Sequence, residues 1–187
     1  MKNYPFAYIV SFLIGTFALH ENLNAQKPEV DLNDLTTINI SSYEGFKKET
    51  GELIRRMKDK TIVALGEGTH GTSEFYKVRY WISKILIEEH GFNIIALEND
   101  YGDSWLLNKA MMQKGVNLEN AMKNNLLSIW RNEEVKEMLE WMRSYNDKRV
   151  KKVTLGGIDH VYLKPDADIL DSLLKRLQLP EVPKLTA

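Results

Sequence analysis

The sequence contains no cysteine among its 187 residues. This excludes disulfide bonds, thiolate metal sites, a cysteine nucleophile and a lipid anchor on an amino-terminal cysteine. An excess of charge of one sign is also missing, because 25 lysines and arginines face 26 aspartates and glutamates, for a net charge of −1. With no bulk basic character, nothing in the composition favours nucleic acid as a partner.

A long uninterrupted apolar run is missing as well. The apolar stretch at residues 4–19 is broken by a proline and two hydroxyl residues and is short for a membrane span. It lies between Lys2 and the small-residue site Leu23-Asn24-Ala25, as in a secretory signal peptide. We therefore expect a signal peptide over residues 1–25 and an exported mature protein, periplasmic or extracellular, with no stable membrane anchor.

The rest of the chain predicts one α/β domain over residues 43–187, after an extended polar lead-in at residues 26–42. Apolar runs at residues 61–65 and 94–97 flank a segment with helical spacing, which is the pattern of a βαβ unit between Thr61 and Asp100. A third strand is expected at residues 153–158; further helices are expected at 43–58, from Asp100 or Asp103 to Gly115, at 118–127, 132–145 and 165–177. We expect a three-layer fold with a mostly parallel sheet and helices on both faces, incomplete at the carboxyl terminus.

Polar side chains gather where the predicted strands end. Glu67 and His70 follow the first strand, and Glu98 ends the second. In parallel sheets the loops at the carboxyl ends of the strands form the ligand crevice. Arg79 falls in the apolar stripe of the intervening helix, where an arginine is costly unless a carboxylate meets it. We expect Arg79 to be buried against Glu67 and Glu98; the alternative is an arginine at the rim that extends to water.

The motifs of common catalytic sites are missing: the chain has no G-x-S-x-G, no HExxH and no Walker A pattern. Thr72 and Ser73 are expected to be helix caps rather than nucleophiles. A histidine three residues after a glutamate suits a general base that activates water while a carboxylate fixes its tautomer. The same groups could instead hold a divalent metal. His90 is expected at a helix end and His160 in a loop, and Trp130 either packs in the core or lines a pocket.

Several separated blocks, in this order, carry a resemblance to a known family. They are residues 66–74 (GEGTHGTSE), 88–92 (EEHGF), 96–98 (ALE), 139–146 (LEWMRSYN) and 156–159 (GGID). In these blocks the sequence closely resembles the erythromycin esterase family. Gly68, where alanine is expected, is a minor departure.

The resemblance implies an ester hydrolase that cleaves the lactone ester of macrolides, an activity of antibiotic resistance, through an activated water and without a covalent enzyme nucleophile. It implies that His70 is the general base and that Glu67, Arg79 and Glu98 are other active-site residues.

Glu74, Trp130 and Asp159 are the candidate substrate-binding residues, and no cofactor is required, although a divalent metal is an alternative. The expected partner is a small-molecule ester or lactone.

Family members are much longer, and their downstream half carries further active-site histidines. The chain stops at Ala187, so it is expected to be either a fragment or unable to run the full mechanism alone. Two other functions stay open: a metal-dependent hydrolase that uses His70 and carboxylates, and a catalytically incomplete binding module.

Overall fold

The computed structural model describes residues 37–66, 68–160 and 163–178. The chain divides into two units, residues 1–37 and 38–187, and the described helices and strands all lie in the second unit. The predicted signal peptide and most of the lead-in lie outside the described residues. None of the described helices is long and apolar enough to cross a membrane.

The first helical segment is divided in two. The sequence predicts one helix over residues 43–58, but the structure has α2 (Tyr43–Glu49) and α3 (Gly51–Met57). Thr50 separates them, and its hydroxyl donates a 2.7 Å hydrogen bond to the carbonyl of Phe46. A threonine that bonds back to the preceding turn competes with the regular helical ladder, which explains the break.

No strand forms over residues 61–65, where one was predicted. Val63 and Leu65 are half-buried and pack against the core, whereas the residues between and before them are exposed. A strand also needs a backbone ladder, and the sheet of the described residues contains only two strands. The predicted βαβ unit is therefore wrong in its first strand.

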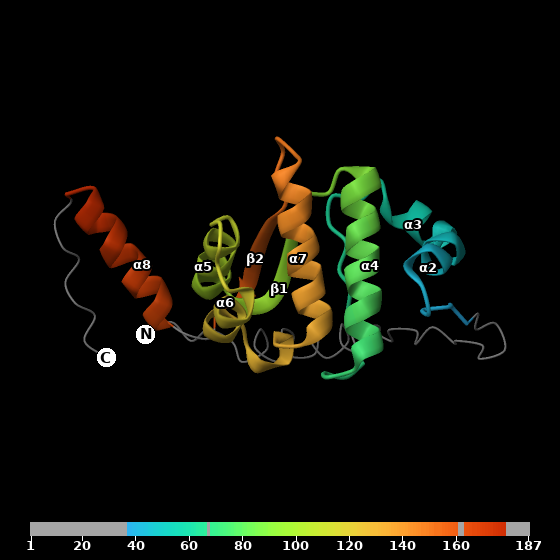
Figure 1. Ribbon diagram of the computed structural model, residues 1–187, viewed down its shortest axis with the longest axis horizontal. Coiled ribbons are helices and arrows are strands. Elements are labelled where there is room, and N and C mark those ends of the chain that lie inside the picture. Colours follow the sequence, from blue (N-terminus) through green and yellow to red (C-terminus); the bar gives the residue numbers. More distant parts are fainter. Residues whose placement is uncertain (1–36, 67, 161–162, 179–187) are drawn as a thin grey trace, which may run out of the picture. The chain divides into compact units, whose positions relative to one another are not determined.

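Helix α4 (Ser73–His90) is the longest helix of the described residues. It ends at Gly91, whose φ of 77° is the left-handed conformation that favours glycine, so His90 lies at the helix end as predicted. The helix packs mainly against α7 (Glu133–Asp147), with further contacts to α3 and α2 (Figure 1). Its buried residues are Tyr76, Tyr80, Trp81, Ile82, Ile85, Leu86 and Ile87. Phe75 in the first turn is exposed, and the buried residues begin at Tyr76.

The sheet consists of β1 (Ile94–Asp100) and β2 (Thr154–Asp159), which pair in parallel (Figure 1). Leu97 pairs with Gly157 and Asp100 with Asp159, so β1 contains one extra residue there and forms a bulge. The bulge brings the β1 backbone close to Gly157, where a Cβ would lie 2.5 Å from the carbonyl oxygen of Asp100. Glycine is thus required at position 157.

The remaining elements complete a mixed α/β fold with parallel strands, as the sequence predicts. Helix α5 (Tyr101–Met111) packs on β2 and on α6 (Leu118–Asn125), and it ends before the Gly115 expected from the sequence. A short 3-10 helix, η2 (Ser128–Trp130), leads into α7, and α8 (Leu163–Arg176) contacts α5. The most deeply buried apolar side chains of the described residues come from α2, α4, α5, α7 and the β2 segment and are Phe46, Ile85, Leu107, Leu139, Met142, Val153 and Leu155.

Candidate active site

His70 lies on an exposed turn between residues 61–66 and α4. The next residue, Gly71, has a φ of 80°, a conformation that a residue with a Cβ rarely adopts. The backbone amide of Gly71 donates a 3.3 Å hydrogen bond to the hydroxyl oxygen of Tyr76. The turn that carries the predicted general base is therefore tied to the first turns of α4. Glu67, its expected partner, lies outside the described residues.

Tyr76 connects this turn to the loop that precedes α7. Its hydroxyl donates a 2.6 Å hydrogen bond to the carbonyl of Ile129, while accepting the bond from Gly71. The side-chain amide of Asn132 donates to the same carbonyl at 3.1 Å. A buried tyrosine hydroxyl with both a donor and an acceptor partner fixes the spacing of two loops that are distant in the sequence.

A shallow cavity of about 400 Å³ lies between these two loops. Ser73 and Glu134 hydrogen-bond to each other across it. The residues that line it come from the His70 turn, α4, η2 and the start of α7 and are His70, Gly71, Ser73, Tyr76, Ser128, Ile129, Asn132 and Glu134. The sequence pattern pointed to His70 but not to the residues around η2 and α7, which become neighbours only through the fold.

The guanidinium of Arg79 lies against two aromatic rings that also contact each other. Its guanidinium carbon is 4.9 Å from the centroid of the Tyr76 ring and 5.2 Å from that of Trp130. The two rings meet edge to face, with centroids 5.7 Å apart. The arginine is half-buried, which is intermediate between the buried and the rim position considered from the sequence. Tyr76 precedes Arg79 by three residues on a helix, so this contact could have been found from the sequence spacing.

Trp130 extends the cluster to the sheet. Its indole is buried, and Nε1 donates a 2.8 Å hydrogen bond to the backbone carbonyl of Glu98 at the end of β1. Trp130 thus contacts both Arg79 and the backbone of Glu98. The expected pairing of Arg79 with the carboxylates of Glu67 and Glu98 stays a prediction. The carboxylate-bearing residue Glu98 is itself exposed.

Glu74 and Asp159 do not line the cavity. Glu74 is exposed in the first turn of α4, and Asp159 is half-buried at the end of β2. Asp159 accepts a 2.7 Å hydrogen bond from the backbone amide of His160. Their proposed contact with substrate stays a prediction.

Asn99, which was not predicted as a site residue, organises the end of β1. Its side-chain amide is buried and donates to Ser104 Oγ at 2.9 Å and to the carbonyl of Asn125 at 3.0 Å. Its Oδ1 accepts a 2.7 Å hydrogen bond from the amide of Leu127. The loop that leads to Trp130 is thereby fixed to the strand end. The sequence did contain a signal that could have identified Asn99, because this asparagine directly follows Glu98 at the end of a predicted strand.

The erythromycin esterase family model matches residues 87–186, which is more than half of the chain. The chain belongs to the erythromycin esterase family. The matched part includes Glu98, Trp130 and Asp159, whereas His70 and Arg79 precede it. The resemblance inferred from the sequence motifs is confirmed.

Two Escherichia coli proteins are among the relatives. The chain is 30% identical to erythromycin esterase type II over 118 residues, which cover 63% of this chain and 27% of that protein. It is 30% identical to erythromycin esterase type I over 123 residues, which cover 63% of this chain and 28% of that protein. The chain thus spans about a quarter of the length of these family members.

A solved structure shares the fold. The chain is similar to the crystal structure of a succinoglycan biosynthesis protein, with a TM-score of 0.59 and 27% sequence identity. The similarity covers 75% of this chain and 35% of that chain. The same α/β arrangement therefore occurs as part of a longer chain in that protein.

Proposed function

We propose that this protein is an exported hydrolase of the erythromycin esterase type, which cleaves an ester or lactone with a water activated by His70. The observation that carries the proposal is the position of His70 at the edge of a cavity whose far wall is fixed through Tyr76. Membership of the erythromycin esterase family supports a hydrolase activity in general. A macrolide lactone as substrate, and a part in antibiotic resistance, rest on the names of the relatives alone.

In this mechanism His70 accepts a proton from water as the water oxygen attacks the ester carbonyl carbon. The carbonyl oxygen gains negative charge, and the ester C–O bond breaks as the proton passes to the leaving alcohol oxygen. Glu67 would orient the imidazole, and the guanidinium of Arg79 supplies a fixed positive charge near the strand ends. Glu98 is the further acidic group of the set. Glu74, Trp130 and Asp159 are proposed to contact the substrate.

Two alternatives make different predictions. A metal-dependent hydrolase would use His70 and the carboxylates as ligands, and its activity would be lost with a chelator and restored by the metal. A binding module that keeps the site without the downstream histidines of the family would bind esters or lactones without turnover. Neither alternative has a geometric observation at His70 that favours it over the leading proposal.

The test is the substitution His70→Ala, with His90→Ala as the matched control at a helix end. Hydrolysis of a panel of esters and lactones, including macrolides, is followed with and without a chelator. Loss of a general base typically lowers the rate by ~10²–10⁴-fold. Near-normal turnover in His70→Ala would show that His70 is not the base, and His90→Ala is expected to keep wild-type turnover.

Export is tested separately. The sequence predicts cleavage after Ala25, so the mature protein should begin at Gln26. Amino-terminal sequencing of the protein from its native host measures this directly. An intact Met1 on the intracellular protein would reject the signal peptide.

A further inference from the structure

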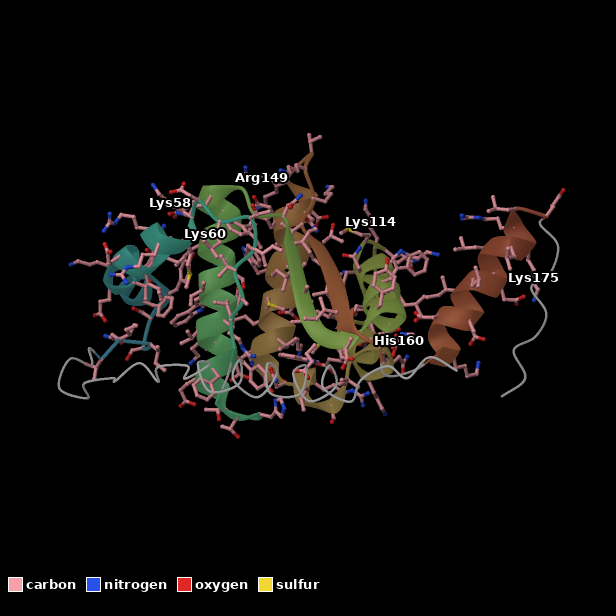
Figure 2. All side chains as sticks on the ribbon, turned by 180° about the vertical axis from the view of Figure 1, so that it is seen from behind. Lys58, Lys60, Lys114, Arg149, His160 and Lys175 are labelled. Atoms are coloured by element: carbon pink, nitrogen blue, oxygen red, sulfur yellow. The ribbon has the colours of Figure 1, made fainter. Side chains whose placement is uncertain are left out.

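Three side chains with metal-ligating atoms meet at the carboxyl-terminal end of the sheet, and none of them lines the cavity at His70. Asp100 is the last residue of β1, His160 follows the last residue of β2, and Asp166 lies in the first turn of α8. One ligand atom from each lies within 4.8 Å of the other two. Figure 2 shows His160 at this end of β2.

The distance between two of these atoms fits a shared ion. His160 Nδ1 and Asp166 Oδ2 are 3.4 Å apart, which is longer than the usual hydrogen-bond range of about 2.7–3.2 Å. Two ligand atoms that each stand about 2.0–2.1 Å from a tetrahedral zinc ion are roughly 3.3 Å apart. The spacing fits two ligands of one ion, and it also lies within the range of a direct ion pair.

Gly102 gives Asp166 access to Asp100. A Cβ at position 102 would overlap the Asp166 carboxylate and would lie 3.2 Å from Ile169 Cδ1. Glycine inside a helix costs about 1 kcal/mol relative to alanine, so its presence in the first turn of α5 needs a reason. The close approach of the α8 carboxylate supplies one.

The electrostatic surroundings favour a cation. Asp100 is buried, and its Oδ1 accepts a 3.0 Å hydrogen bond from the amide of Gly102. The carboxylates of Asp100 and Asp166 meet beside one imidazole, and a divalent ion would offset the repulsion between their charges.

We propose that Asp100, His160 and Asp166 bind one divalent transition-metal ion of the Zn²⁺ or Mn²⁺ class. One imidazole nitrogen and two carboxylate oxygens are ligands that such ions accept, whereas Ca²⁺ and Mg²⁺ prefer oxygen alone. Three protein ligands leave a position for water. The ion would also join α8 to the ends of both strands. This site is separate from His70 and does not depend on the proposed hydrolase activity.

The experiment is a calorimetric titration of the purified chain with ZnCl₂ and, separately, MnCl₂. We expect about one equivalent to bind at the site in wild type. His160→Ala and Asp166→Asn should each weaken binding at least about tenfold, because each removes one ligand. His90→Ala and Asp168→Asn are the matched controls, a histidine elsewhere and an exposed aspartate of the same helix, and both should bind as wild type does.

A thermal shift provides an independent readout. An ion that binds only the folded state raises Tm, so Zn²⁺ should raise the Tm of wild type more than that of His160→Ala at the same concentration. The proposal is overturned if no stoichiometric binding occurs, or if His160→Ala and Asp166→Asn bind as wild type does. It is also overturned if the controls lose binding equally, or if binding is lost in His70→Ala, which would place the ion at the cavity. If His70→Ala still binds the ion, the result supports a separate site, whether or not this variant loses hydrolysis.

Discussion

The substitution Asn99→Ala tests whether the loop that carries Trp130 is held by the end of β1. Asn99 is 1% exposed, and three of the four hydrogen bonds of its side chain have distances between 2.7 and 3.0 Å. Alanine removes all of these bonds at once. The Ser104 hydroxyl can rotate to another partner, but the amide of Leu127 and the carbonyl of Asn125 cannot.

The magnitude follows from those two backbone groups. A buried polar group that loses its partner costs about 1–3 kcal/mol. Because both groups are only partly buried, we expect the lower half of that range for each, or about 2–4 kcal/mol of unfolding free energy in total. For a domain of this size 1 kcal/mol shifts Tm by roughly 2–4 °C, so Tm should fall by roughly 5–15 °C.

The assay is urea unfolding, followed by tryptophan fluorescence and circular dichroism. Asn120→Ala is the matched control, because Asn120 is exposed on the neighbouring helix α6, and it should change stability by less than about 0.5 kcal/mol. Asn99→Asp keeps an acceptor for the Leu127 amide but places a charge against the carbonyl of Asn125, so it should destabilise at least as much as alanine. An Asn99→Ala curve that overlays wild type would refute the reasoning.

Two further predictions concern charged groups. Arg79→Ala removes cation–π contacts to two rings, each worth about 0.5–2 kcal/mol. It should therefore lower the unfolding free energy by about 1–4 kcal/mol, and Arg79→Lys should restore only part because lysine cannot stack as a plane. A urea midpoint equal to that of wild type would contradict this. Burial and the charges of Asp100 and Asp166 raise the pKa of the Asp103 carboxyl above its ordinary value of 3.8. The ionised carboxylate therefore lowers the unfolding free energy at pH values above the raised pKa. Asp103→Asn should therefore raise the urea midpoint at pH 7, and the gain should shrink as the pH falls towards 3.8; an equal gain at both pH values would rule out the electrostatic cause.

The sequence by itself determined the features that depend on local pattern. Apolar runs located β1 and β2, and the caps at Asp100 and Gly91 fixed where α5 begins and α4 ends. Backbone conformation and capping depend on residues within one turn, so they can be read from neighbours in the chain. The motif blocks also identified the family, because each block is a short run of adjacent residues that is visible in the sequence whatever the fold does around it.

Only the tertiary structure decided which side chains meet. A strand was predicted at residues 61–65 from its apolar run, but the structure has no backbone ladder there, because a strand depends on a distant backbone. Arg79 and Trp130 are 51 positions apart in the sequence, and no periodic pattern relates them. The same holds for Asp100 and Asp166. Such contacts arise from the packing of α4 on α7 and of α8 on α5, and packing depends on the shape of the whole core rather than on any one segment of the chain.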